Sequence, residues 1–293
     1  MPDGLVAFTG TRDSFHRRLA RFNHDRLSPG TPTADWREAI AEQARMLVEE
    51  GEFLEAARAA VAARAAEAPT DADGFVAWFA TLERNGPGQD DRLFPWIAEQ
   101  ATREEMRWFL TQEVAGEAGF DDLSALTQVK MPVPTKLEIA RNYWDEMGRG
   151  NPKGMHGPML ATLSARLGLD PTVDGTVWES LALANTMAGL AANRRYAYHS
   201  VGALGAVEQT APSRATLVAL GLKRLGVPAE DRHYFDLHAV LDVKHAEAWN
   251  AEAIHPLVAA DPALARPIAE GALMRLECGA ACFERYRAEF GVA

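Results

Sequence analysis

Three side chains of metal-binding type lie close together near residue 240: His238, Asp242 and His245. Their offsets of four and seven positions place them on one side of an α-helix, which turns once in about 3.6 residues. Phe235 and Trp249 fall on the same side, so the three polar groups occupy an apolar, inward face. A buried carboxylate needs a cation or several donors, and imidazole with carboxylate suits iron, manganese or zinc. We therefore favour a metal site over a hydrogen-bonded His–Asp pair in the core.

A second candidate ligand is Glu208, the only acidic residue between Glu179 and Glu230. The residues before it are small or apolar, and they include Gly205, which weakens a helix unless a close approach requires it. An acid on such a face is expected to be buried. The alternative is an acid near a helix end that pairs with Arg214.

The segment around residue 110 offers one more carboxylate. Glu113 follows Phe109 and Leu110 by about one helical turn, which predicts a buried face. Glu117 stands one turn further on and is the competing assignment. We prefer Glu113 because it lies nearer the apolar end of that face.

Glu146 and His156 are separated by a stretch that contains Gly148, Gly150 and Pro152. These residues interrupt a helix, so the two side chains need not lie on one rigid element. A ligand-bearing segment of this kind can become ordered when a metal binds. The alternative is a surface loop with a solvated glutamate.

The elements that must position these residues are predicted to be helices throughout. Strand-type alternation is almost absent, whereas helical periodicity recurs along the chain. Asn85-Gly86-Pro87-Gly88 marks a boundary between residues 1–88, a helical extension whose first 35 residues could be partly disordered, and residues 89–293. In the second part we expect helices near 93–100, 103–118, 135–147, 153–167, 174–191, 192–209, 213–225, 229–250 and 262–289.

Composition excludes several classes of function. The net charge of -11 argues against nucleic-acid binding, which needs a basic surface. No apolar run is long enough for a membrane span, and the N-terminus has no signal-peptide pattern, so a cytoplasmic protein is expected. Cys278 and Cys282, one turn apart, are interpreted as small core residues in a reducing compartment.

The full series of residues resembles the haem-oxygenase-like di-iron oxidases and oxygenases. The matching pattern is a glutamate, then Glu146-Met147-Gly148-Arg149-Gly150 through His156, then the lone Glu208, then His-x-x-x-Asp-x-x-His from His238 to His245. The likeness covers about residues 90–290. It implies an all-α, haem-oxygenase-like seven-helix bundle. The implied iron ligands are Glu113, Glu146, His156, Glu208, His238, Asp242 and His245.

The resemblance also implies a function. Two Fe ions would react with O₂ as co-substrate, an external electron donor would supply electrons, and the substrate would be a small molecule, such as an amine or amino acid in a biosynthetic pathway. Glu146 resembles an extra carboxylate of members that oxygenate amine nitrogen, which favours N-oxygenation over oxidative carbon–carbon cleavage or desaturation. We also expect a homodimer.

Two other interpretations stay open. The first is a protein of the same fold that binds iron without catalysis. The second is a true haem oxygenase. Haem degradation needs one axial histidine and an open face, so a centre with seven polar ligands argues against it.

Overall fold

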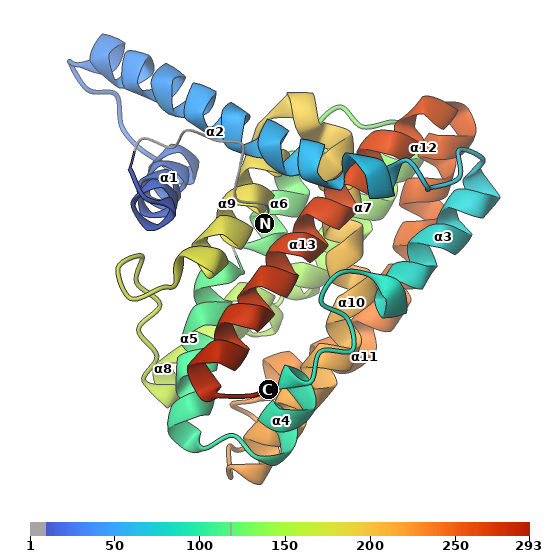
Figure 1. The fold of residues 1–293 in the computed structure, drawn as a ribbon. Helices are drawn as coiled ribbons and strands as arrows, with labels where there is room; N and C mark the ends of the chain where they lie inside the picture. The colour runs from blue at the N-terminus through green and yellow to red at the C-terminus, as the bar shows by residue number, and fades with distance from the viewer. Residues whose placement is uncertain (1–9, 118) are drawn as a thin grey trace.

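The chain folds into a bundle of packed helices in a computed structural model, which describes residues 10–117 and 119–293 (Figure 1). The first helices are α1 (Arg12–Leu27), α2 (Trp36–Ala65), α3 (Ala72–Asn85), α4 (Leu93–Glu99), α5 (Arg103–Gly116), α6 (Phe120–Thr127) and α7 (Val133–Glu146). The others are α8 (His156–Leu167), α9 (Trp178–Ala192), α10 (Ala197–Arg224), α11 (His233–Ala248), α12 (His255–Ala260) and α13 (Ala265–Phe290). Among the described residues no strand occurs beyond an isolated bridge between Met147 and Met155, so the all-α prediction is confirmed.

Helices α10 and α13 run side by side through the middle of the bundle (Figure 1). Their backbones approach closely because both contact points are glycines. A Cβ at Gly202 would lie 1.9 Å from the carbonyl oxygen of Ile268, and one at Gly271 would lie 1.9 Å from that of His199. There is no room for a side chain at either position, so the two glycines set the distance between the central helices.

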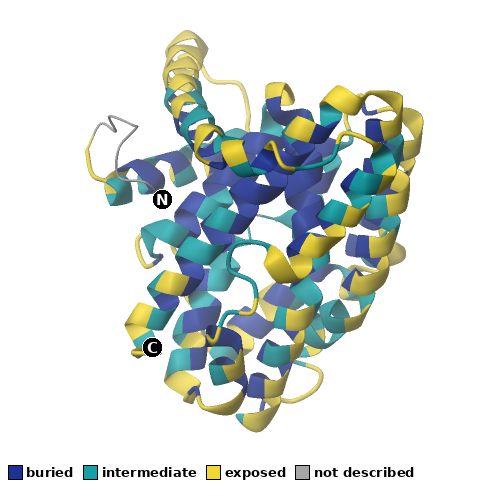
Figure 2. Ribbon diagram, turned by 45° about the vertical axis from the view of Figure 1, so that its right-hand side comes forward, coloured by how far each residue is buried: buried dark blue, intermediate teal, exposed yellow. Residues whose placement is uncertain are grey.

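The N-terminal helices belong to the same hydrophobic core as the bundle. Phe15 of α1, Phe53 of α2 and Phe75 of α3 are buried in one cluster with Val201 and Leu273 of the central helices. Only the first half of α2 projects away from this core, and it is largely exposed (Figure 2). The proposed division near residue 88 stays a prediction. Residues 1–9, part of the segment expected to be disordered, lie outside the described residues.

Several helix boundaries differ from those predicted. The expected helices 192–209 and 213–225 form the single helix α10, which continues through Pro212. The short helix α6 was not predicted; it begins after Gly119, whose φ of 72° turns the chain sharply. Helix α11 passes directly into a π-helix, η4 (Trp249–Ile254).

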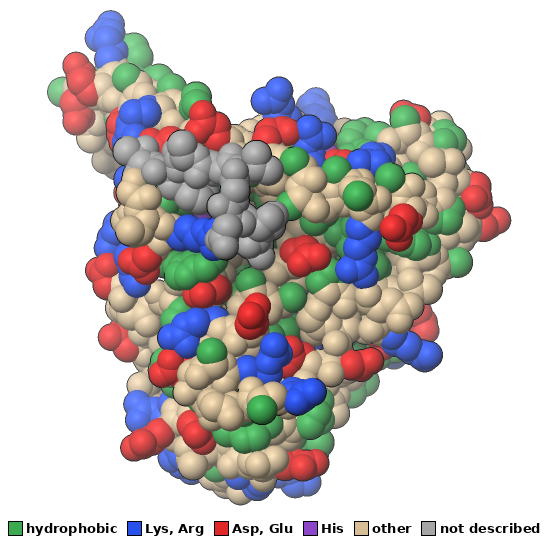
Figure 3. All heavy atoms as spheres, in the orientation of Figure 1, with side chains coloured by type: hydrophobic (Ala, Val, Ile, Leu, Met, Phe, Trp, Pro, Cys, Tyr) green, Lys and Arg blue, Asp and Glu red, His purple; other side chains and the backbone are tan. Residues whose placement is uncertain are grey.

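One face of the molecule carries charges of both signs (Figure 3). In the face drawn in Figure 3, acidic and basic side chains are interspersed, and neither sign gathers in a large patch. None of the described helices is long and apolar enough to cross a lipid bilayer.

Candidate metal centre

Six of the seven predicted ligands come together inside the bundle, carried by four helices. Glu146 is the last residue of α7 and His156 the first of α8. Glu208 lies on α10, and α11 carries His238, Asp242 and His245. This arrangement, with ligands from facing helices, is how helical bundles build di-iron carboxylate sites.

A tight loop brings the ends of α7 and α8 together. It consists of two 3₁₀ turns, η1 (Gly148–Gly150) and η2 (Pro152–Gly154), closed by the bridge between Met147 and Met155. The backbone φ is 60° at Gly148 and 83° at Gly150. A Cβ at Gly148 would lie 2.3 Å from the carbonyl carbon of Gly154, so only glycine fits there. As predicted, Glu146 and His156 do not share one rigid helix.

The six side chains form two groups of three. In the first, ligand atoms of Glu146, His156 and His238 all lie within 4.8 Å of one another. In the second, the same holds for Glu208, Asp242 and His245. Each group therefore offers at least one carboxylate and one imidazole to a single cation.

Hydrogen bonds orient two of the imidazoles toward these groups. His238 Nδ1 lies 2.6 Å from the carbonyl oxygen of Tyr234, so Nδ1–H donates to it and Nε2 is left as the free ligand atom. His245 Nε2 lies 3.2 Å from Asp145 Oδ2, while its Nδ1 faces Glu208 Oε2 at 3.5 Å. A carboxylate behind a histidine is the usual support for a metal-bound imidazole.

Supporting residues also fix the carboxylates. The amide of Asn142, one turn before Glu146, donates to Glu208 Oε1 at 2.5 Å. Asp145 in turn accepts from Arg149 Nε at 2.6 Å. Sequence reasoning missed Asn142 and Asp145, although their positions on the turn before the α7–α8 loop were the available signal.

The buried carboxylates of the site repel one another. Burial, together with the neighbouring Glu208, raises the pKa of Glu146 to about 9, and burial raises that of Asp242 well above its ordinary value. For His245, burial lowers the pKa, but its interactions with the carboxylates of Glu208 and Asp145 outweigh burial and raise the pKa to about 9. Without a cation, these groups therefore hold protons to limit the repulsion.

Two ligand nitrogens also have unmet hydrogen-bonding capacity. His156 Nδ1 and His245 Nδ1 are buried without a hydrogen-bond partner among the described residues. His156 Nδ1 lies 2.7 Å from Glu146 Oε2, but the pair does not have hydrogen-bond geometry. Nitrogen and carboxylate oxygen atoms that converge in this way fit metal ions of the iron type.

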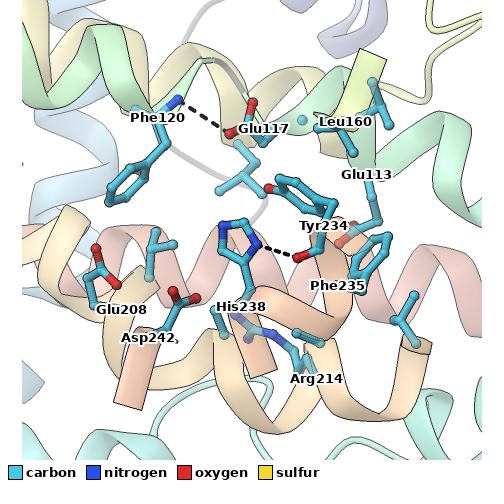
Figure 4. A pocket seen from close by; sticks show the side chains of 18 of the residues that line it. Glu113, Glu117, Phe120, Leu160, Glu208, Arg214, Tyr234, Phe235, His238 and Asp242 are labelled. Atoms are coloured by element: carbon cyan, nitrogen blue, oxygen red, sulfur yellow. Dashed lines mark hydrogen bonds between the residues drawn. The ribbon is translucent and has the colours of Figure 1, made fainter. Parts of the chain in front are cut away.

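The seventh predicted ligand, Glu113, is not part of either group. It lies on α5 near Arg214, Tyr286 and Arg275, and burial raises its pKa. Glu117, four positions further, lies close enough to His156 for the charges of the two side chains to interact, and it lines the cavity. Its carboxylate accepts from the backbone N–H groups of Gly119 and Phe120 at 3.1 and 3.3 Å. Figure 4 shows Glu117 above His238, with Tyr234 between His238 and Glu113 in that view.

A cavity of about 170 Å³ adjoins the two groups. Glu117, Glu146, Glu208, His238 and Asp242 line it together with mainly apolar side chains (Figure 4). These apolar residues include Phe94, Val114, Leu160, Leu183, Met187, Val207, Val218 and Phe235. The candidate centre thus faces a largely apolar cavity into which a small molecule can fit.

Comparisons with known proteins agree with this description. The sequence family of iron-containing redox enzymes matches residues 107–280, which is more than half of the chain. A crystal structure from Shewanella denitrificans, of a domain of unknown function with a haem oxygenase-like fold, is similar with a TM-score of 0.53. The two share 15% sequence identity, and the match covers 75% of this chain and 92% of that one. No protein with a curated function is significantly similar in sequence. The fold is therefore haem oxygenase-like, and the chain belongs to the family of iron-containing redox enzymes.

Proposed function

We propose that the protein is an O₂-activating, non-haem di-iron oxygenase or oxidase that acts on a small molecule. The observation that carries this proposal is the pair of three-residue groups, both built from nitrogen and oxygen ligands, each of which contributes two side chains to the wall of one cavity. A single iron would need only one such group. Bound Fe(II) supplies the electrons that reduce O₂, which is chemistry that side chains alone do not provide.

The chain's own residues orient the centre and keep it dry. His238 is held by the carbonyl of Tyr234 and His245 by Asp145, so both rings present a lone pair inward. Asn142 holds Glu208 in place. Apolar lining by residues such as Leu160 and Val207 excludes water, which strengthens the electrostatic interactions inside the cavity.

We further propose Glu117, which directly follows α5, rather than Glu113 as the fourth carboxylate of the centre. Glu146, Glu208 and Asp242 carry three negative charges against the four positive charges of two Fe(II) ions. A fourth carboxylate makes the buried centre neutral, which lowers the cost of burying it. Glu117 is the nearer candidate because its charge acts on His156. It would exchange its backbone hydrogen bonds for the metal.

Among reactions of this class, oxygenation of an amine nitrogen is our first candidate. Its support is Glu146, which joins the first group with its carboxylate 2.7 Å from His156. Oxidative carbon–carbon cleavage or desaturation is the second candidate, and electrons would come from an external donor in either case. A purely iron-binding role would not require a substrate-sized cavity beside the ligands.

Oxygen consumption by anaerobically Fe(II)-loaded protein tests the proposal. We expect wild-type protein to consume O₂ in proportion to its bound iron. Glu146→Gln keeps the size of the side chain but removes its charge, and it should slow this reaction. Trp144→Phe, a change at an exposed residue two positions earlier, is the control. O₂ uptake no greater than that of the same amount of free Fe(II) would refute the proposal.

A further inference from the structure

Two arginines line the cavity beside the candidate centre: Arg214 of α10 and Arg275 of α13. Arg275 is buried and Arg214 is half-buried, and arginine is seldom buried unless it is paired. Among the described residues, no carboxylate lies within 4.0 Å of either guanidinium, the distance that defines an ion pair. The sequence had suggested Arg214 as a partner of Glu208. Glu208 instead accepts from Asn142, so Arg214 is left available to the cavity.

Several hydrogen-bond donors of these arginines are unused. Arg214 Nη1 and Arg275 Nε and Nη1 are buried without a partner within the described part of the chain. Among the described residues, the one hydrogen bond of Arg214 is from its Nη2, which donates to Thr210 Oγ1 at 2.9 Å. Its guanidinium otherwise lies over the rings of Phe94 and Phe283, at 5.9 and 5.5 Å from their centroids. A guanidinium has five donors, so both side chains have capacity for a ligand.

The local charge is also unbalanced. The acidic side chain that acts on both arginines is Glu113, and the nearby thiols of Cys278 and Cys282 stay neutral because burial raises their pKa. Burial lowers the pKa of Arg214 to about 9, which still leaves it charged at neutral pH. Even with Glu113 ionised, one positive charge is left over. An uncompensated buried charge is costly, and a bound monoanion would remove that cost.

The space for Arg275 depends on a glycine. A Cβ at Gly279, one turn further along α13, would lie 3.0 Å from Arg275 Nη1. The guanidinium therefore lies across the glycine. A side chain at position 279 would therefore crowd Arg275 Nη1.

We propose that Arg214 and Arg275 form the subsite that binds the carboxylate of an anionic small-molecule substrate, whose less polar remainder extends through the cavity toward His238 and Asp242. A carboxylate matches the planar donor pattern of guanidinium groups and supplies the single negative charge that the site lacks. The apolar lining accommodates the rest of the molecule. The role of the ligand as a substrate rests on the proposed function. The binding of a carboxylate by the two arginines does not depend on that function.

Calorimetry with hexanoate as the probe tests this subsite, on Fe(II)-loaded and on metal-free protein. We expect hexanoate to bind both forms, and hexanamide and hexylamine, which have similar shapes, to bind far more weakly. Arg214→Gln and Arg275→Gln should each weaken hexanoate binding roughly tenfold or more, as expected for loss of a charged hydrogen bond. Arg275→Lys, which keeps the charge, should recover part of the loss. Arg285→Gln, on the same helix but paired with Glu289, is the matched control and should bind normally.

Specific results would overturn the subsite. These are no hexanoate binding by wild-type protein, equal binding of hexanoate and hexanamide, or unchanged binding in both glutamine variants that keep a native circular dichroism spectrum. Binding only to the iron-loaded form would point to coordination by the metal and would also refute it. If the proposed function is wrong but the subsite is right, the result differs from these. Hexanoate would then bind through the arginines, but iron-loaded protein would not consume O₂.

Discussion

His156 Nδ1 lies 2.7 Å from Glu146 Oε2, although these residues end one helix and begin the next. The loop between them closes through three successive residues at positive φ, Gly148, Arg149 and Gly150. The geometry of this pair therefore depends on two glycines that bind nothing themselves. The other group is placed by regular helices, since Asp242 and His245 share α11 and Glu208 faces them from α10.

The first prediction concerns iron content. Anaerobic loading should give about two irons per chain, as in helical carboxylate sites. His238→Ala removes one imidazole from the first group and should lower that number. His255→Ala is the control, because His255 is 40% exposed and contacts only Asp73 of the acidic residues. Elemental analysis after desalting gives the answer, and unchanged iron in His238→Ala would exclude His238 as a ligand.

The second prediction separates Glu117 from Glu113. Glu117→Gln should reduce bound iron, because it removes the fourth negative charge proposed for the centre. Glu113→Gln should leave iron content near wild type, since this side chain lies beside Arg214 and Tyr286. The opposite result, iron lost from Glu113→Gln alone, would restore Glu113 as the ligand.

The third prediction concerns pH. The folded, metal-free protein holds protons on Glu146 and His245 up to about pH 9, whereas an unfolded chain releases them near 4.5 and 6.5. The unfolded chain thus binds fewer protons, so metal-free stability should fall as pH rises from about 7 to 9. Iron displaces these protons. The difference in Tm between Fe(II)-loaded and metal-free protein should therefore increase from pH 7 to pH 9. Anaerobic thermal melts measure this difference, and a difference that stays constant or decreases would contradict the assignment of Glu146 and His245 as ligands.

The fourth prediction concerns the central helix crossing. Gly271→Ala places a methyl group 1.9 Å from the His199 carbonyl oxygen, so α10 and α13 must separate. Overpacking of this kind costs about 3 kcal/mol. Gly51→Ala in α2, where the added methyl meets nothing within 4 Å, should instead stabilise by about 0.5–1 kcal/mol. Chemical denaturation measures both, and a neutral Gly271→Ala would show that the crossing tolerates a side chain.

Residues that repeat at helical spacing could be placed from the sequence. His238, Asp242 and His245 fall on one face of α11 as predicted, because the helical period alone determines this. The all-α fold was predictable for the same reason. In contrast, Pro212 suggested a break that is absent from α10. Proline removes the backbone bond to the carbonyl of Glu208 and its ring crowds that carbonyl, but buried residues on both sides, such as Thr210 and Ala215, keep the helix packed.

Contacts between distant segments could not be predicted in this way. Glu113 and Glu117 are four positions apart, about one helical turn, so periodicity alone cannot tell which of them lies near the proposed ligands. Asp145 supports His245 across 100 residues of sequence. Arg275 also reaches the cavity through the packing of α13, and its own neighbours in sequence gave no sign of it.

The central claim is that two irons bind side by side at the two groups of ligands. Mössbauer spectroscopy of ⁵⁷Fe-loaded protein after exposure to O₂ tests it most directly. The account predicts that most of the iron gives the spectrum of a magnetically coupled Fe(III) pair, and that this fraction falls in Asp242→Asn, which removes a charge from the second group. A spectrum of isolated paramagnetic iron, at one ion per chain, would contradict it.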